Sequence, residues 1–235
     1  RFDAYRRPNP AWQRLFGLAR RSGEPRDTFI RPRQELPFLE PYDRIRLSDG
    51  GSSDLPAMPV LAMEERVEAE AGTDVAISAV FEKDKRPAAI ERSLGDGTVL
   101  YIAAFPGLSY LWTALQPPRV PDRGPNTHTV PSGFDRTARH LICRGLTLAN
   151  VVPRLDFGGK LVDARLLRSG TSFVLPLANY EPEVGNEVTV ATGLDAPIET
   201  VTSAYHGKLA FKRVDGALVV TLPSLGYGDI LRLDD

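Results

Sequence analysis

The sequence predicts an α/β module followed by an all-β sandwich. Three patterns point to this fold class. Residues 98–105 form an apolar run, typical of a strand that is covered on both faces. Residues 133–152 carry apolar side chains at helical spacing. After Pro153, short strand-like runs alternate with turn residues at regular intervals, as in a β-sandwich. We therefore expect two domains, 1–152 and 153–235.

Length and composition are those of an ordinary globular protein. The 235 residues carry a formal net charge of −1, which argues against nucleic-acid binding by phosphate neutralisation. Residues 1–50 are nevertheless rich in arginine. The sequence contains no 18-residue apolar run, so no membrane span is expected. It begins at Arg1 without a signal peptide, and we interpret it as the C-terminal part of a longer polypeptide or as a processed chain. The sequence does not indicate the cellular compartment.

The α/β module is expected to begin with a short helix at 11–18, where Trp12 and Phe16 share one face. An extended connection and a Gly-Ser loop follow. Four strands are then predicted, at 60–63, 75–81, 88–92 and 98–105. The turns between the last three are too short for helical crossovers, so these strands should form an antiparallel meander within a mixed sheet. A short helix at 107–115 and a proline-rich surface loop at 117–131 complete this part.

The helix at 133–152 should cover one face of the strand at 98–105, and an upstream domain or second subunit should cover the other. Ser132 and Asp135 resemble a capping box at its start. Its predicted apolar face includes Leu141, Ile142 and Ala149, which we expect to be buried. In the sandwich, strands are expected at 160–168, 171–178, 187–192, 198–203, 208–213, 217–222 and 229–233.

The sequence contains no convincing catalytic constellation. The one cysteine, Cys143, lies within a predicted helix without a nucleophile elbow, so we interpret it as an inert thiol. The three histidines show no metal-ligand spacing, and neither a metal site nor a cofactor is predicted. Glu64 and Glu65 follow a predicted strand and are the candidates for a glycosidase carboxylate pair, but only weak ones.

Aromatic side chains offer a possible binding site. Trp12, Tyr110 and Trp112, together with Tyr101, could form a sugar-stacking platform, because aromatic faces pack on the apolar faces of sugars. The competing interpretation is that these rings pack in the core or in an interface. The sequence alone favours packing and leaves the platform open.

Residues 56–111 resemble the later half of a β-galactosidase trimerisation domain. The matching features are an apolar strand near 60–62, the segments 74–77 and 86–90, and the pattern Gly95-x-Gly97-x-Val99-x-Tyr101 with an exit at Phe105-Pro106-Gly107. The resemblance implies a partial class I glutamine-amidotransferase-like fold that does not keep the amidotransferase catalytic residues. The residues after 153 are similar in kind to the small β-sandwich that closes β-galactosidase-like glycoside hydrolases.

This resemblance implies the C-terminal assembly portion of a β-galactosidase-like carbohydrate-active protein. Such a portion is not itself catalytic, and its parent would be a glycoside hydrolase. The implied partners are an upstream catalytic domain or a second copy of the chain, with carbohydrate as a further candidate ligand. Two alternatives stay open: a carbohydrate-binding module that uses exposed aromatic side chains, and a hydrolase whose carboxylates converge only on folding.

Overall fold

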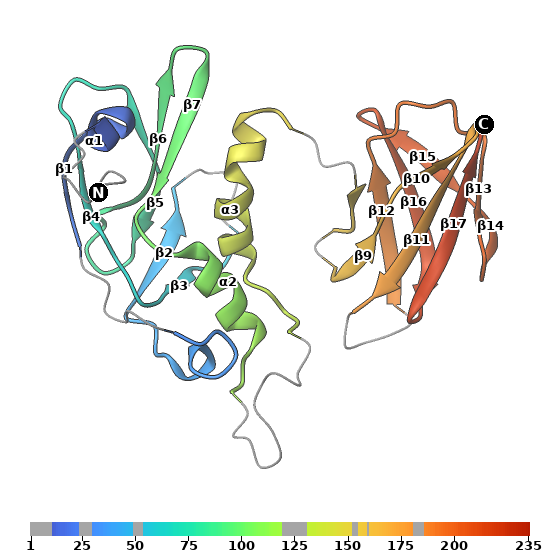
Figure 1. Ribbon diagram of the computed structural model, residues 1–235, viewed down its shortest axis with the longest axis horizontal. Helices are drawn as coiled ribbons and strands as arrows, with labels where there is room; N and C mark the ends of the chain where they lie inside the picture. The colour runs from blue at the N-terminus through green and yellow to red at the C-terminus, as the bar shows by residue number, and fades with distance from the viewer. Residues whose placement is uncertain are drawn as a thin grey trace. The chain divides into compact units, whose positions relative to one another are not determined.

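The computed structural model describes residues 11–23, 30–48, 54–118, 131–151, 155–158, 160–180 and 186–235 (Figure 1). The chain divides into two compact units, Arg1–Val151 and Val152–Asp235. The predicted Gly-Ser loop, most of the proline-rich loop, His128 and Pro153 lie outside the described residues. Each unit is described by itself.

A five-stranded sheet forms the centre of the first unit. Its strands are β2 (Asp43–Leu47), β3 (Met58–Val60), β5 (Val75–Phe81), β6 (Pro87–Leu94) and β7 (Gly97–Ile102), in the order β3-β2-β5-β6-β7. The predicted meander β5-β6-β7 is confirmed. The expected mixed sheet is not formed, since every pairing within this sheet is antiparallel. The short turns explain this, because a parallel pair needs a long crossover connection.

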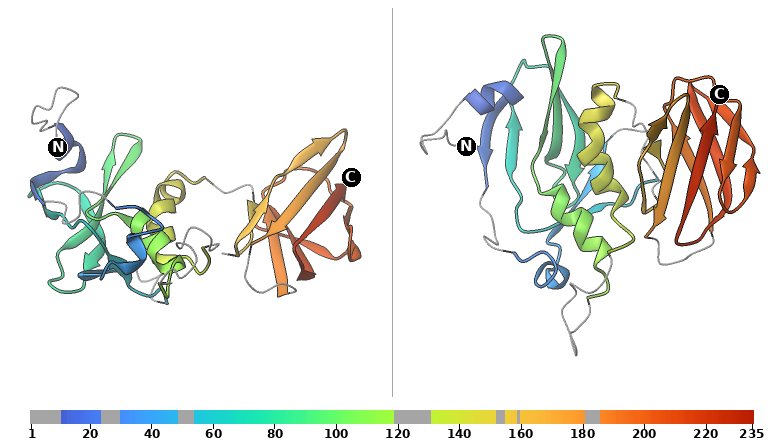
Figure 2. Two further views of the ribbon diagram at one scale, coloured as in Figure 1. Left: turned by 60° about the horizontal axis from the view of Figure 1, so that its bottom comes forward. Right: turned by 45° about the vertical axis from the view of Figure 1, so that its right-hand side comes forward.

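Further elements pack on this sheet. The helices are α1 (Ala11–Phe16), α2 (Pro106–Ala114) and α3 (Arg136–Leu148), with a short 3-10 helix, η1 (Leu36–Phe38). The strands β1 (Leu18–Ser22) and β4 (Arg66–Ala69) form a separate antiparallel pair. Helices α2 and α3 pack against each other, α3 also contacts β3 and β7, and α1 contacts β6 and β7 (Figures 1 and 2).

Strand β6 shows that α1 and α3 lie on opposite faces of the sheet. Consecutive residues of a strand point to opposite faces. Glu91 accepts two hydrogen bonds from Arg144 of α3, whereas the neighbouring Arg92 donates to the carbonyl oxygen of Arg14 in α1. The expected cover of strand 98–105 by the later helix is therefore confirmed. On the other face α1 contacts β7, an internal element where only an outside partner was expected.

Helix α3 differs from its prediction in its start and in its buried face. Asp135 alone caps the helix, since its carboxylate accepts the N–H of Ala138 at 2.7 Å. Leu141 is buried as predicted, but Ile142 is 49% exposed and Ala149 is also exposed. The sheet-facing stripe runs through Ala138 and Leu141 to the Arg144–Glu91 ion pair, which turns Ile142 outward.

The cap of α3 gives a pH-dependent prediction. Burial raises the pKa of Asp135, although hydrogen bonds from backbone N–H groups oppose the shift. A carboxyl with a raised folded pKa contributes most to stability below its unfolded pKa, and that contribution is lost as the pH rises through the folded pKa. Asp135→Asn keeps the acceptor without the charge, so its free energy of unfolding should equal or exceed that of the wild type at neutral pH.

Urea unfolding of both proteins at neutral pH and at about pH 4 measures this difference. The amount by which the free energy of unfolding of Asp135→Asn exceeds that of the wild type should shrink at the lower pH. The control Asp135→Ala removes the cap and should lower the free energy of unfolding by about 1 kcal/mol. A wild type that is more stable than Asp135→Asn at neutral pH would show that the buried charge is not penalised.

The second unit is a β-sandwich, as predicted. One sheet contains β9 (Val162–Ala164), β10 (Leu167–Ser169), β11 (Ser172–Asn179), β13 (Thr200–Ser203), β14 (Gly207–Leu209) and β17 (Gly228–Asp234). The other contains β8 (Leu155–Asp156), β12 (Asn186–Thr192), β15 (Phe211–Val214) and β16 (Ala217–Leu225). Alternate residues of the long strands, such as Leu175 and Leu177 in β11 and Leu231 and Leu233 in β17, enter one apolar core with Leu218, Val220 and Leu222 of β16.

Candidate functional site

Glu65 is the centre of a buried polar cluster in the first unit. Glu65 is 3% exposed. Its backbone N–H donates to the carbonyl oxygen of Ala103, and this bond holds Glu65 beside the end of β7. Arg21 of β1 donates through Nε and Nη2 to the two carboxylate oxygens at 2.6 and 2.8 Å. The hydroxyl of Tyr101 in β7 donates to the same carboxylate. The cluster therefore fastens the β1–β4 pair to the central sheet.

Arg21 is held in this cluster by two further features. Its guanidinium lies 5.2 Å from the centre of the Tyr101 ring, a cation–π distance. The hydrogen bond with Glu65 raises the pKa of Arg21, while burial opposes that shift. Gly23, just after β1, passes so close that a Cβ there would meet the carbonyl oxygen of Glu64 at 2.8 Å. The chain therefore needs glycine at this approach.

The neighbouring Glu64 belongs to a different ion pair. Arg86 contacts both Glu64 and Asp84, and its guanidinium lies 5.3 Å from the centre of the Phe81 ring. Burial opposes ionisation of Asp84, but the contributions from Arg86 together outweigh it and lower the pKa of Asp84. The two consecutive glutamates thus bind two different arginines.

This arrangement does not suit glycoside hydrolysis by Glu64 and Glu65. A general acid and its partner carboxylate must face one substrate, with oxygens free to reach the glycosidic bond or a water molecule. Here the two carboxylates are engaged by Arg86 and Arg21, respectively. The geometry indicates two structural ion pairs.

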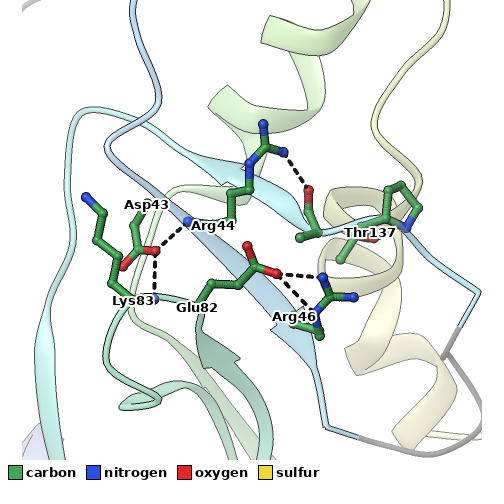
Figure 3. A network of polar contacts seen from close by, with 8 residues as sticks. Asp43, Arg44, Arg46, Glu82, Lys83 and Thr137 are labelled. Carbon is green, nitrogen blue, oxygen red and sulfur yellow. Dashed lines mark hydrogen bonds and ion pairs between the residues drawn. The ribbon is translucent and has the colours of Figure 1, made fainter.

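A second polar network lies at the edge formed by β2 and the β5–β6 turn (Figure 3). The buried Asp43 carboxylate accepts the backbone N–H groups of Arg44 at 2.7 Å and Lys83 at 3.3 Å. Arg46 donates twice to Glu82, at 3.0 and 2.6 Å. Asp43 thereby fixes the turn, and the side chains of Arg44, Arg46 and Lys83 remain exposed.

Thr137 of α3 connects the helix to this region of the unit. Its hydroxyl donates to the carbonyl oxygen of Pro56, just before β3, while Arg44 Nη1 donates to the next carbonyl, that of Ala57, at 3.4 Å (Figure 3). Both contacts hold backbone, so the network positions β2, β3 and α3 relative to one another. We assign it a structural role.

The predicted aromatic residues lie in separate packing environments. Trp12 stacks on Phe16 within α1, with ring centroids 5.9 Å apart. Tyr110 stacks on Phe134 at 4.5 Å. Trp112 donates its indole N–H to the carbonyl oxygen of Leu39 at 3.0 Å and packs on the cluster of Leu36, Leu61 and Leu115. The structure does not bring Trp12 together with the other two, since α1 and the α2–α3 pair cover opposite faces of the sheet.

The other candidates have ordinary surroundings. Cys143 is half-buried on α3. In His206, the ring Nε2 lies 2.8 Å from the carbonyl oxygen of Ser224. Among the described residues, no three histidine, cysteine or acidic side chains gather as metal ligands would. Within those same ranges, no helix has the length and apolar character of a membrane span.

The Arg21–Glu65–Tyr101 cluster was missed by sequence reasoning. Glu65 stood out as a carboxylate after a strand, but its partners lie 44 and 36 positions away in the chain. Neither distance corresponds to a helical or strand period, so a single sequence carries no signal that pairs them. The available hint was that Glu65 lies two positions after the apolar strand expected at 60–63.

The geometry thus defines a class of fold: a layered unit with an antiparallel sheet and helices, followed by a β-sandwich. No protein-family model matches the sequence, and no curated protein matches it. Among solved structures, the chain is similar to alpha-L-fucosidase isoenzyme 2 from Paenibacillus thiaminolyticus, with a TM-score of 0.53 and 14% identity. The match covers 83% of this chain and 32% of the fucosidase. It shows a shared fold with a small part of that glycoside hydrolase.

Two β-galactosidases give looser alignments. The enzymes from Bacillus circulans sp. alkalophilus and Rahnella sp. R3 have TM-scores of 0.45 with 16% and 17% identity. Each alignment covers 94% of this chain, but 25% and 24% of the respective enzyme. At this score they carry no argument about the fold.

Proposed function

We propose that this chain is the non-catalytic C-terminal portion of a β-galactosidase-like carbohydrate-active protein, and that it supports contacts between domains or subunits. The observation that carries the proposal is the fold shared with the fucosidase, which extends over 83% of this chain and only 32% of that enzyme. Such a proportion is expected of an accessory portion. The ion pairs of Glu64 and Glu65 agree, because they engage the strongest carboxylate candidates in structural contacts.

The trimerisation-type, amidotransferase-like character of the first unit is part of this proposal. It is supported by the meander that contains Gly95-x-Gly97-x-Val99-x-Tyr101 and by the helix that follows at Pro106. The sheet departs from the mixed one expected for such a fold, since all its pairings are antiparallel.

Helix α3 offers the contact surface that an assembly role requires. Ile142 and Leu146, four positions apart on one face of the helix, are both about half exposed, and so is Val151 just beyond its end. Apolar side chains that gather on one exposed stripe mark contact sites between proteins or domains. We propose a second copy of the chain or an upstream catalytic domain as the partner that covers this stripe.

The test uses the purified 235-residue chain. It should not hydrolyse aryl β-galactosides or aryl α-L-fucosides, because Arg86 and Arg21 engage the carboxylates of Glu64 and Glu65. Sedimentation equilibrium should detect self-association that Ile142→Asp and Leu146→Asp weaken. The control Leu94→Asp places the same charge on an exposed leucine of the β6–β7 hairpin and should have no effect.

Two outcomes would contradict the proposal. Hydrolysis that Glu64→Gln or Glu65→Gln abolishes, in a variant whose circular dichroism shows it folded, would make the chain an enzyme in its own right. A chain that stays monomeric at high micromolar concentration would reject the version in which a second copy covers α3.

A further inference from the structure

Three exposed tyrosines lie at one end of the β-sandwich. Tyr180, Tyr205 and Tyr227 are 51%, 79% and 85% exposed. Large aromatic side chains bury much apolar surface when they are covered, so leaving three of them exposed at one end of a sheet calls for an explanation. We refer to these three residues as the tyrosine end.

Hydrogen bonds of the strands place the three tyrosines at the ends of three adjacent strands. β11, β17 and β13 are neighbours in the six-stranded sheet (Figure 1). At the end of β11, the N–H of Asn179 donates to the carbonyl oxygen of Tyr227 at 2.9 Å. At the end of β13, the N–H of Ala204 donates to the carbonyl oxygen of Ile230 at 2.9 Å. Tyr180, Tyr227 and Tyr205 therefore belong to three adjacent strand ends. The register staggers them along the strands, since Tyr205 falls level with Asp229 and Tyr180 with Gly226.

Buried polar contacts hold the turns that carry the tyrosines. Ser203 Oγ donates to Asp229 at 2.6 Å and accepts the N–H groups of Tyr205 at 3.1 Å and His206 at 2.8 Å. Asn179 Nδ2 donates to the carbonyl oxygens of Leu225 at 3.2 Å and Gly226 at 2.9 Å. The backbone at each tyrosine is thus fixed before a ligand arrives, which lowers the entropic cost of binding.

Small residues occupy the outward-facing positions at these strand ends. Ala178 pairs with Gly228, and Ala204 follows β13. A Cβ at Gly228 would meet the carbonyl oxygen of Leu177 at 2.6 Å, so the close approach of β11 and β17 needs glycine there. Short side chains at these positions leave the outer sheet surface low beside Tyr180, whereas Tyr205 and Tyr227 fall on the positions that alternate with them.

The chemistry of the tyrosine end suits a neutral, hydroxyl-rich ligand. The turns 204–206 and 226–228 contain no lysine, arginine or acidic residue, and Glu181 follows Tyr180 in the sequence. An anionic ligand such as a nucleic acid would need cationic donors for its phosphates. A phenol ring instead offers a flat apolar face and a hydroxyl, which complement the C–H face and the hydroxyl groups of a sugar.

We propose that Tyr205 and Tyr227 form a carbohydrate-binding surface that takes a neutral sugar chain at the ends of β13 and β17, with Tyr180 on the adjoining face at the end of β11. The surface differs from the aromatic platform that the sequence suggested, since it lies on the other unit. The inference rests on the proposed function in so far as that function assigns the chain to a carbohydrate-active protein.

Affinity electrophoresis of the 235-residue chain, in native gels that contain soluble galactan or fucosylated xyloglucan, tests the surface. The wild type should be retarded by at least one of the two polysaccharides. The double variant Tyr205→Ala/Tyr227→Ala should lose at least tenfold in affinity. Tyr205→Phe keeps the ring and should retain most of the binding. The control Val214→Ala changes an exposed residue of the other sheet and should bind as the wild type does.

Each opposite result would overturn the inference. Wild-type mobility that neither polysaccharide alters would reject it, as would a double variant that is retarded as strongly as the wild type. Sedimentation that responds to the double variant, without any polysaccharide binding, would make the tyrosine end a protein interface. Binding is measured without turnover, so its failure is distinct from that of the non-catalytic assembly role, which hydrolysis and α3 variants test.

Discussion

Leu141→Ala is expected to lower the free energy of unfolding of the first unit by about 2–5 kcal/mol. Leu141 is fully buried between α3 and the central sheet, in the apolar cluster that also contains Ile45 and Ala89. Truncation removes apolar contacts and leaves a cavity that the antiparallel sheet cannot close. Chemical denaturation followed by far-UV circular dichroism measures the change.

Ile142→Ala is the matched control for this prediction. It changes a side chain of the same size on the next position of the same helix, but one that faces outward. The expected loss is within about 0.5 kcal/mol. Equal losses at the two positions would mean that the assigned buried face of α3 is wrong.

Glu65→Ala should lower the free energy of unfolding by about 1–3 kcal/mol, because it leaves the partly buried Arg21 and the Tyr101 hydroxyl without their acceptor. The substitution leaves the Arg21 guanidinium without its bidentate carboxylate and removes the acceptor of the Tyr101 hydroxyl. The β1–β4 pair would lose its main polar attachment to the sheet. Thermal unfolding and protease sensitivity at β1 would both report the loss.

The exposed pair of Arg31 and Glu35 provides the comparison. Its N···O distance is also short, at 2.7 Å, but both side chains are in contact with solvent. Such pairs contribute about 0–1 kcal/mol, so Glu35→Ala should change the unfolding midpoint little. A Glu65→Ala protein no less stable than Glu35→Ala would show that the buried cluster contributes nothing to the fold.

Much of the fold was predictable because local signals and long-range structure agree. In the sandwich, turns such as Asp215-Gly216 and Ser169-Gly170 separate short alternating runs, so strand positions follow from the sequence. The meander was predictable for the same reason. The mixed sheet was wrong because an apolar run was taken as a sign of α/β topology, whereas β7 is covered by elements distant in sequence, α1 and α3.

The candidate sites were less predictable, for two physical reasons. Ile142 and Ala149 match a helical apolar period, but the ion pair of Arg144 with Glu91 settles which way α3 turns, and a charged pair adds nothing to an apolar pattern. Tyr205 and Tyr227 are exposed because they lie in connections beyond the strand ends. A single tyrosine in a turn carries no signal of how many others lie beside it.

The position of β17 has a consequence for how the sandwich forms. This strand is hydrogen-bonded on one side to β11 and on the other to β13, yet it is made after both. Neither neighbour can complete its pairing in the sheet until the ribosome has passed residue 234. The chain segments that join β11 and β13 to β17 must close into loops before the sheet forms, and such non-local pairing slows folding. We therefore expect the sandwich to be the late-folding part of the chain, and one that a nascent chain halted before β17 does not assemble.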